Sequence, residues 1–245
     1  MKLEIIGSSS SGNCYVLQND HEAIIIELGC KIQAVKKAVN WNLGKVKCAI
    51  VSHSHNDHAA FAKDAAAAGI LVMASEETLN EKSLYGEPFT LPISAGVRYK
   101  CGGFFIQPFN VHHDVLCYGY IIYHEEMGKM LFVTDTVSMG YTINGLNHIL
   151  IEANYSDEIV DRNIESGKLN YVLRSRLLNS HMELQSTKLV LSRQNLSEVQ
   201  NIVLIHLSSG NSDPDMFKQE IINCTGKCVH IAKPGLEIDV SKTPY

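Results

Sequence analysis

Short runs of hydrophobic residues, bounded by polar or glycine residues, recur along the chain. From Lys2 to Val51 these runs are strand-like, except over residues 31–39, where Ile32, Val35 and Val39 fall on one face of a predicted helix. Later strands are predicted at Phe104–Gln107, Tyr118–Tyr123, Met130–Thr134 and Ile202–Ile205, and later helices at Tyr171–Leu178, at Ser186–Val199 and after Asp213. This order predicts an α/β fold with two facing mixed sheets and outer helices.

Length and composition fit one globular domain over residues 1–245. The chain is 45% hydrophobic, and a two-layered α/β domain commonly reaches this length undivided. The opening Met1–Ile6 has too short an apolar run for a signal peptide, and no segment approaches a membrane span. Seven cysteines without a Cys-x-x-Cys pair indicate reduced thiols. We therefore expect a cytoplasmic protein that does not contact a membrane.

The segment that follows the predicted strand ending at Val51 carries candidate metal ligands. His53, His55, Asp57 and His58 fall within six residues, and the chain turns from strand to helix there. In an extended segment His53 and His55 point to the same side. Imidazole and carboxylate suit Zn, Mn or Fe, and two such ions a few ångströms apart form a clamp for displacement at phosphorus. A histidine-rich surface loop is the alternative, but four ligand-type residues directly after a strand favour a dinuclear site.

Other candidate ligands stand at the ends of other hydrophobic runs. His113, Asp135 and His206 each follow a predicted strand, which would bring them to one edge of a sheet. The order His-x-His-x-Asp-His, then His, Asp and His, resembles the metallo-β-lactamase superfamily of metallohydrolases, whose fold is an αββα sandwich. The resemblance implies two divalent ions, Zn first and Mn as the alternative. One ion would be held by His53, His55 and His113, the other by Asp57, His58 and His206, with Asp135 as the bridge.

Most of the chain resembles the YycJ-like branch of that superfamily, which lies near RNase Z. The matching stretches are 7–15, 113–120, 132–136, 150–154, 174–181 and 206–211. Glu27 stands where the family usually has Asp, which leaves the orientation of the groups behind the ligands open. Tyr155 stands where this branch tends to have His. His112 is an alternative to His113 as ligand, although the neighbouring Asp114 favours His113.

The resemblance also implies a mechanism. A metal-activated water attacks phosphorus, and Asp57 accepts its remaining proton. The leaving alkoxide needs a proton, which a Glu-oriented His provides in the RNase Z group, and Glu152 and His181 occupy the matching positions. We therefore expect Asp57, His181 and Glu152 to be catalytic.

The substrate is less constrained by the sequence. RNase Z has a Gly-rich arm, but here only 54 residues separate His58 from His113, without such an insertion. The β-CASP nucleases have an inserted domain, but here Asp135 and Glu152 lie only 17 positions apart. With a formal charge of -5, the chain lacks the excess of basic residues that a surface for binding a nucleic-acid polymer has. These features favour a small nucleotide over DNA.

The expected function is therefore hydrolysis of cyclic mononucleotides, as in the phage anti-Pycsar proteins of this fold, which counteract antiphage signalling in the host cytoplasm. A homodimer is expected, because few loops remain to close the pocket. The alternative is a YycJ-like 5′-to-3′ DNA exonuclease. A thioester or lactone hydrolase is a further alternative, because the fold alone does not decide the chemistry.

Overall fold

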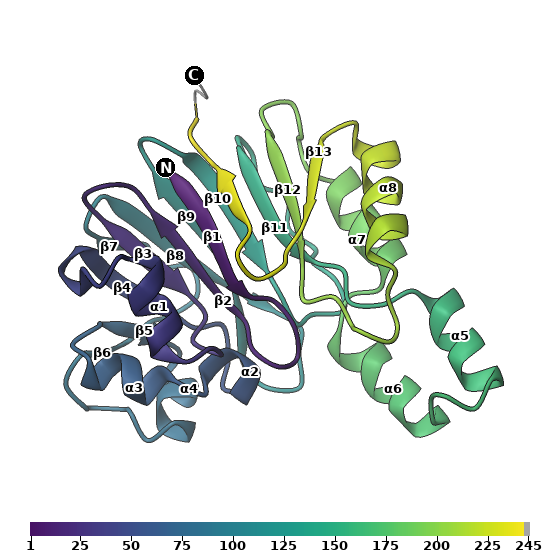
Figure 1. The fold of residues 1–245 in the computed structure, drawn as a ribbon, viewed down its shortest axis with the longest axis horizontal. Coiled ribbons are helices and arrows are strands. Elements are labelled where there is room, and N and C mark those ends of the chain that lie inside the picture. The colour runs from purple at the N-terminus through teal and green to yellow at the C-terminus, as the bar shows by residue number, and fades with distance from the viewer. Residues whose placement is uncertain (243–245) are drawn as a thin grey trace.

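The computed structural model describes residues 1–242, and of residues 171–173 and 176 it describes only the backbone. Two seven-stranded sheets face one another, in the orders β14-β1-β2-β3-β4-β5-β6 and β13-β12-β11-β10-β9-β8-β7. Figure 1 shows helices on the outer sides of this pair. The arrangement confirms the predicted α/β sandwich. None of the described helices is long and apolar enough to cross a membrane.

The first sheet is built from the N-terminal half of the chain and the last strand. Its strands are β1 (Lys2–Gly7), β2 (Cys14–Gln18), β3 (Ala23–Ile26), β4 (Val46–Ile50), β5 (Val72–Ala74), β6 (Thr90–Pro92) and β14 (Glu237–Asp239). The strands β1 to β3 are antiparallel and β3 to β6 parallel. The outer helices of this half are α1 (Ile32–Ala38), α2 (Asn56–Ala59), α3 (Ala62–Ala67) and α4 (Glu76–Glu81), with a 3-10 turn, η1, at Leu43–Lys45.

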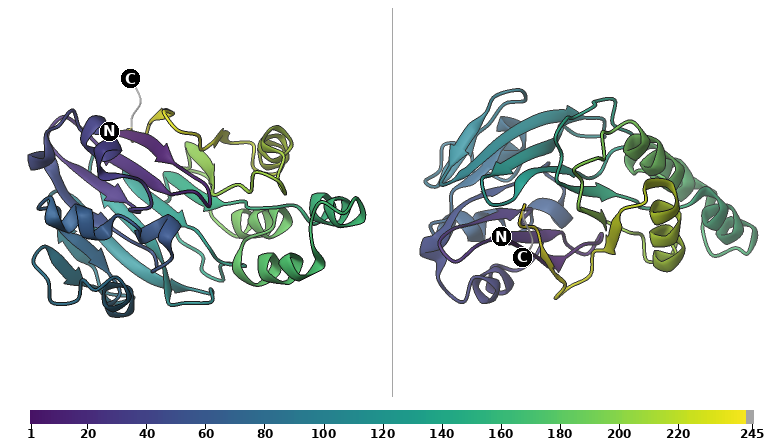
Figure 2. Two further views of the ribbon diagram at one scale, coloured as in Figure 1. Left: turned by 60° about the horizontal axis from the view of Figure 1, so that its bottom comes forward. Right: turned by 90° about the horizontal axis from the view of Figure 1, so that it is seen from above.

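The second sheet continues from the middle of the chain. Its strands are β7 (Tyr99–Cys101), β8 (Phe104–Val111), β9 (Cys117–His124), β10 (Gly128–Val133), β11 (His148–Glu152), β12 (Asn201–Ile205) and β13 (Cys228–Ile231). Its helices are α5 (Asp157–Glu165), α6 (Tyr171–Ser180), α7 (Leu184–Ser192) and α8 (Pro214–Thr225). The two views of Figure 2 show these helices gathered beside β11 to β13, at one end of the sheet.

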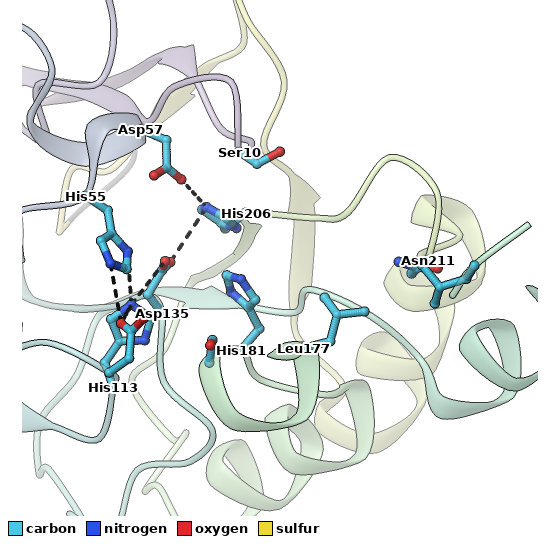
Figure 3. Close-up of a pocket in the computed structure, with 12 residues that line it drawn as sticks. Ser10, His55, Asp57, His113, Asp135, Leu177, His181, His206 and Asn211 are labelled. Carbon is cyan, nitrogen blue, oxygen red and sulfur yellow. Dashed lines mark hydrogen bonds and ion pairs between the residues drawn. The ribbon is translucent and has the colours of Figure 1, made fainter. Parts of the chain in front are cut away.

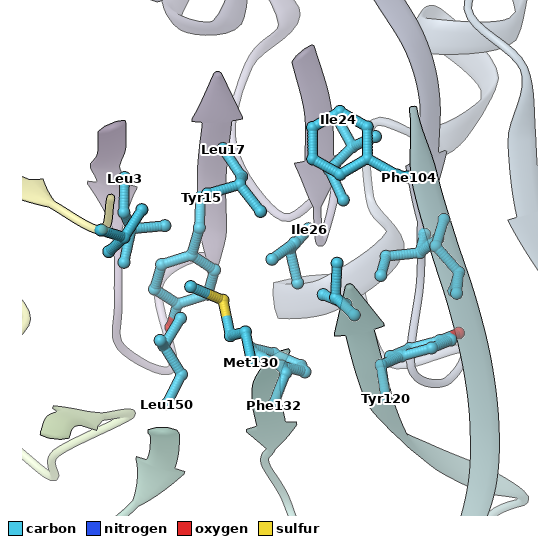
Figure 4. Packing of buried hydrophobic residues seen from close by; sticks show 14 of the residues in the cluster. Leu3, Tyr15, Leu17, Ile24, Ile26, Phe104, Tyr120, Met130, Phe132 and Leu150 are labelled. Carbon is cyan, nitrogen blue, oxygen red and sulfur yellow. The ribbon is translucent and has the colours of Figure 1, made fainter. Parts of the chain in front are cut away.

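The hydrophobic core between the sheets comes from strand residues that alternate inward. Tyr15, Phe104, Tyr120 and Phe132 are completely buried there, and Figure 4 shows these rings interleaved with aliphatic side chains. The ring centroids of Tyr15 and Phe132 lie 5.7 Å apart in an edge-to-face arrangement, which aromatic pairs prefer. This core joins the two sheets and so fixes the strand ends that carry the polar cluster described below.

Two helix predictions need correction. The helix predicted over 186–199 is α7, which ends at Ser192. Gln194 is held by the loop before β11, where its side chain accepts from Ile143 N at 2.9 Å and donates to Tyr141 O at 2.9 Å. Asn195 then accepts from Ser197 N, a local turn that competes with helix. The chain turns from strand to helix at the His-rich segment as expected, but the helical part is divided between α2 and α3, with Ala60 and Phe61 between them.

Candidate metal centre

The loop between β4 and α2 delivers the His-rich segment to the edge of the first sheet. His55 is the residue before α2, and Asp57 and His58 lie in its first turn. The end of β3 fixes this loop from behind, since Leu28 N donates to His58 O at 2.7 Å. Gly29 permits that approach: a Cβ there would lie 1.8 Å from Asp57 O. A larger residue at position 29 would therefore displace the backbone of the cluster.

One group of donor atoms combines this loop with the segments that follow β8 and β10. His53, His55, His113 and Asp135 each offer an atom, and these atoms lie within 4.8 Å of one another. His113 Nε2 is 3.3 Å from His55 Nδ1, and His53 Nε2 is 3.7 Å from Asp135 Oδ2. His112 is exposed and outside this group, whereas the side chain of His113 is 1% exposed. The geometry therefore favours His113 over His112.

A second group shares Asp135 with the first. Asp57, His58 and His206 join it, again within 4.8 Å. Asp57 Oδ2 lies 3.2 Å from His58 Nε2 and 3.1 Å from His206 Nε2, and Asp135 Oδ2 lies 3.4 Å from His58 Nε2. Figure 3 shows Asp135 between His113 on one side and His206 on the other. The structure thus brings together all of the residues expected to hold metal.

The donor set fits metal ions on structural grounds. His53 Nε2 is buried and has no hydrogen-bond partner in the described part of the chain. A buried ring nitrogen without a partner is costly unless a ligand satisfies it. Burial holds the pKa of His53 well below its usual value, so the ring is neutral, as a metal ligand must be. Burial raises the pKa of Asp57, but hydrogen bonds from His206 and His58 outweigh it and hold that pKa well below its usual range.

A further set of polar groups orients the histidines. Ser52 Oγ lies 2.9 Å from His53 Nδ1, and Glu27 Oε2 lies 3.5 Å from His58 Nδ1. The Glu27 carboxylate also accepts from Ser52 N at 3.3 Å, so it contacts the His-rich segment through the backbone of Ser52 and lies at ion-pair distance from His58. Asn154 Nδ2 lies 3.0 Å from His206 Nδ1. Ser52 and Asn154 were not predicted from the sequence, where each reads as an ordinary polar residue beside a strand end.

Three of the seven described non-glycine residues with a positive φ lie at these strand ends. Glu27, Asp135 and His206 have positive φ values of 66°, 46° and 55°. Non-glycine residues in this region cost on the order of 1 kcal/mol or more each and persist where the surrounding structure enforces them. All three residues carry a polar side chain at a strand end: Glu27 and His206 directly follow β3 and β12, and Asp135 lies two positions after β10.

Glu152 and His181 form a pair beside the second donor group. His181 Nδ1 lies 2.7 Å from Glu152 Oε1, and the ring of His181 stacks on that of His206 at 5.3 Å. Glu152 is completely buried, and its other oxygen accepts from Thr136 N and Met182 N at 3.2 Å. Burial lowers the pKa of His181, but the Glu152 carboxylate more than offsets it and raises that pKa to about 9. The pair thus holds a proton at neutral pH.

A pocket of about 430 Å³ opens onto these groups (Figure 3). Hydroxyl, amide and aliphatic side chains complete its wall, and Leu169 and Leu177 contribute its apolar part. Among the described residues that line it there is no Lys or Arg. The residues that line the pocket are Ser10, His55, Asp57, His113, Asp114, Asp135, Leu169, Leu177, Ser180, His181, His206 and Asn211.

The comparison with protein families identifies this architecture. A family model described as "Metallo-beta-lactamase superfamily" matches residues 9–158, more than half of the chain. The chain belongs to the metallo-beta-lactamase superfamily. The two sheets and the gathered His and Asp residues are therefore those of a metallo-beta-lactamase-fold hydrolase, and the His and Asp groups are able to bind metal ions.

Several known proteins are similar to this superfamily member along nearly its whole length. An exodeoxyribonuclease YycJ of Bacillus anthracis is 24% identical over 235 residues, which cover 90% of this chain and 88% of the relative. An exodeoxyribonuclease WalJ of Streptococcus pneumoniae is 25% identical over 238 residues, covering 91% and 87%. The crystal structure of the metallo-beta-lactamase fold protein YhfI from Bacillus subtilis superimposes with a TM-score of 0.73 at 17% identity, covering 97% and 98%.

Proposed function

We propose that this protein is a dinuclear metal-dependent phosphodiesterase. The observation that supports this reaction above others on the same fold is the Glu152–His181 pair, at 2.7 Å, beside the two donor groups. A phosphodiester releases an alkoxide, which gains more from a proton donor than the leaving group of a thioester does. The proposal assigns His53, His55 and His113 to one ion, Asp57, His58 and His206 to the other, and Asp135 to both. When bound, two such ions supply an activated water and neutralise charge on the phosphoryl oxygens.

The residues of the chain then divide the proton transfers between them. Asp57 faces the pocket from the first turn of α2, with its carboxylate ionised, and so is placed to accept the proton of the attacking water. His181 faces it from the opposite wall, beyond the end of α6, and donates to the leaving oxygen. Glu152 fixes the orientation of the His181 ring through Nδ1, which leaves Nε2 for the substrate.

The substrate that we propose first is DNA, attacked from an end. The relatives named as exodeoxyribonucleases align with about nine tenths of this chain and of themselves, so the similarity includes the segments that carry Glu152, His181 and His206. The net charge and the short spacings between motifs favoured a small nucleotide over DNA, and this proposal reverses that order. An exonuclease of this kind places one terminal phosphodiester in the pocket and holds the rest of the strand outside it.

A cyclic mononucleotide is the second candidate, and one observation favours it. The described residues lining the pocket include two apolar side chains, Leu169 and Leu177, but no cation. A base with a single phosphate charge needs an apolar contact and little counter-charge, whereas a polymer is held by several phosphates. A pocket of this composition therefore suits a ligand of one charge.

The test uses the full chain supplied with Mn or Zn and a panel of substrates: 5′-phosphorylated single-stranded DNA, the four cyclic mononucleotides and bis-p-nitrophenyl phosphate. The proposal expects mononucleotides released from the DNA end, whereas opened cyclic mononucleotides with intact DNA would select the second candidate. His181→Ala should lower kcat by about 100- to 10,000-fold on the substrate with an alkoxide leaving group. It should affect bis-p-nitrophenyl phosphate much less, because nitrophenolate leaves unprotonated.

A matched control is available beside the site. His112→Ala removes an exposed imidazole one position from His113, and it should leave turnover of every substrate unchanged. If His181→Ala lowers kcat equally for both kinds of leaving group, His181 is not the proton donor. Hydrolysis of thioesters with no turnover of any phosphodiester would refute the proposed function as a whole.

A further inference from the structure

The outer face of β7 to β10 carries an unusual row of side chains at the end of the strands away from the metal cluster. The pairing registers place Lys100 opposite Phe105, Phe105 opposite Tyr123, and Tyr123 opposite Lys129. Across the four strands the side chains therefore form one row, with a cation at each end and two aromatic rings between them. Directly opposite side chains lie about 5 Å apart on one face of a sheet, so the four form a continuous surface.

The contacts within this row agree with the register. The Phe105 and Tyr123 ring centroids are 6.3 Å apart and tilted by 49°, and Lys100 Nζ lies 5.7 Å from the Phe105 centroid. Tyr123 is 41% exposed. Arg98, Gln107 and Ile121 join the two rings and Lys129 around a hollow of about 250 Å³. No carboxylate lines this hollow in the described part of the chain.

The fold explains why the row is accessible, with Lys100 and Tyr123 exposed and Phe105 and Lys129 partly buried. Helices α7 and α8 lie beside β11 to β13 (Figure 2), and the loop after β10 covers only the part of β9 and β10 near Ile121 and Leu131. A solvent-facing strand position normally takes a polar residue. Two aromatic rings with three flanking cations, on a chain of formal charge -5, therefore indicate a surface that binds something anionic with a flat apolar part.

We propose that this face, formed by Arg98, Lys100, Phe105, Tyr123 and Lys129, is an accessory binding surface for single-stranded nucleic acid. One base would lie in the hollow against a ring, since that volume is below the range for a whole drug-sized ligand. The flanking phosphates would pair with the cations, the combination by which proteins hold single strands without reading sequence. A duplex buries its bases and would use only the cations.

The surface lies far from the chemistry. Lys129 and Asp135 are six positions apart on and after β10, which corresponds to about 20 Å along a strand. The inference extends the proposed function, because it supplies the cations and stacking contacts that the metal-lined pocket lacks. It concerns binding alone, so it can fail while the phosphodiesterase proposal stands.

The test measures binding of a fluorescein-labelled, uncleavable phosphorothioate oligonucleotide by anisotropy. Tyr123→Ser and Phe105→Leu should each weaken binding at least about fivefold, as expected for loss of base stacking. An abasic oligonucleotide with the same phosphates should be insensitive to both changes. Lys129→Gln should reduce the slope of log Kd against log salt by about 0.7, the value for one single-strand phosphate contact.

The chain provides matched controls. Tyr85→Ser removes a tyrosine that is 49% exposed elsewhere, and Lys63→Gln an exposed lysine on α3; neither should change the affinity. All variants should hydrolyse bis-p-nitrophenyl phosphate at the unaltered rate, which separates this inference from the catalytic proposal. Unchanged oligonucleotide affinity in Tyr123→Ser would overturn the inference. So would light scattering that shows the unaltered protein as a dimer and Tyr123→Ser as a monomer, because the face would then be a subunit interface.

Discussion

Replacing Glu152 by Gln tests whether this carboxylate keeps the proton on His181. The substitution preserves the size of the side chain, and the amide oxygen can still accept from Thr136 N and Met182 N. The amide nitrogen would then face His181 Nδ1, where it donates instead of accepting. The charged form of His181 loses its main partner, and burial, which lowers its pKa, is then opposed only by the carboxylates of Asp135 and Asp57.

The magnitude follows from the size of the pKa change. With a pKa of about 9, His181 is about nine tenths protonated at pH 8. At the ordinary value of about 6.5, only about 3% would be protonated at that pH, a loss on the order of 30-fold in competent enzyme. At pH 6 both forms are mostly protonated, and the two enzymes should differ by less than about twofold through this effect.

The assay is the pH dependence of kcat/KM from pH 5.5 to 10 for a substrate with an alkoxide leaving group. The proton donor is active below its pKa and inactive above it, so the descending alkaline limb should move to lower pH in Glu152→Gln. Far-ultraviolet circular dichroism and metal content confirm that the variant is folded and loaded. A uniform loss at all pH values, with the alkaline limb unmoved, would refute the assigned role of Glu152.

Three other substitutions and one change of conditions test the site. Asp57→Ala should abolish hydrolysis and lower the bound metal measured by mass spectrometry, and full activity with unchanged metal would contradict the mechanism. Glu27→Gln should weaken metal binding about 10- to 100-fold in a chelator competition, whereas His112→Ala should bind as the unaltered chain does. Gly29→Ala should weaken metal binding as well, because its Cβ would meet Asp57 O at 1.8 Å. An unaltered affinity for metal would show that the loop relaxes freely. Raising salt should lower kcat/KM steeply for DNA and only slightly for a cyclic mononucleotide.

The ligand cluster was predictable because it follows directly from strand ends. A hydrophobic run that stops at a polar residue places that residue at a sheet edge, and His53, Asp135 and His206 all have this context. The choice between His112 and His113 was not predictable in this way. Neighbouring residues in an irregular segment have no fixed period, and the loop between β8 and β9 decides which ring turns inward.

Other features depend on geometry that periodicity does not describe. Glu27 has a positive φ of 66° at the end of β3, and its carboxylate lies 3.5 Å from His58 Nδ1. No hydrophobic pattern encodes such a turn. The length of α7 was likewise overestimated, since the helical pattern continues in the sequence while Gln194 is bound by a distant loop. Both the turn at Glu27 and the end of α7 therefore depend on contacts between residues that are remote in sequence.

The structure places the metal-binding groups and the substrate-facing groups on different kinds of element. The candidate ligands lie at the edges of two sheets joined by a common core, where a change of backbone would disturb many contacts. His181 instead follows α6, and the same helix contributes Leu177 and Ser180 to the pocket wall. Since α6 projects beyond the sheets (Figure 1), its sequence can change without moving the ligands. Substitutions on α6 should therefore alter which phosphodiester is accepted, and how its leaving group is protonated, while metal binding remains constant.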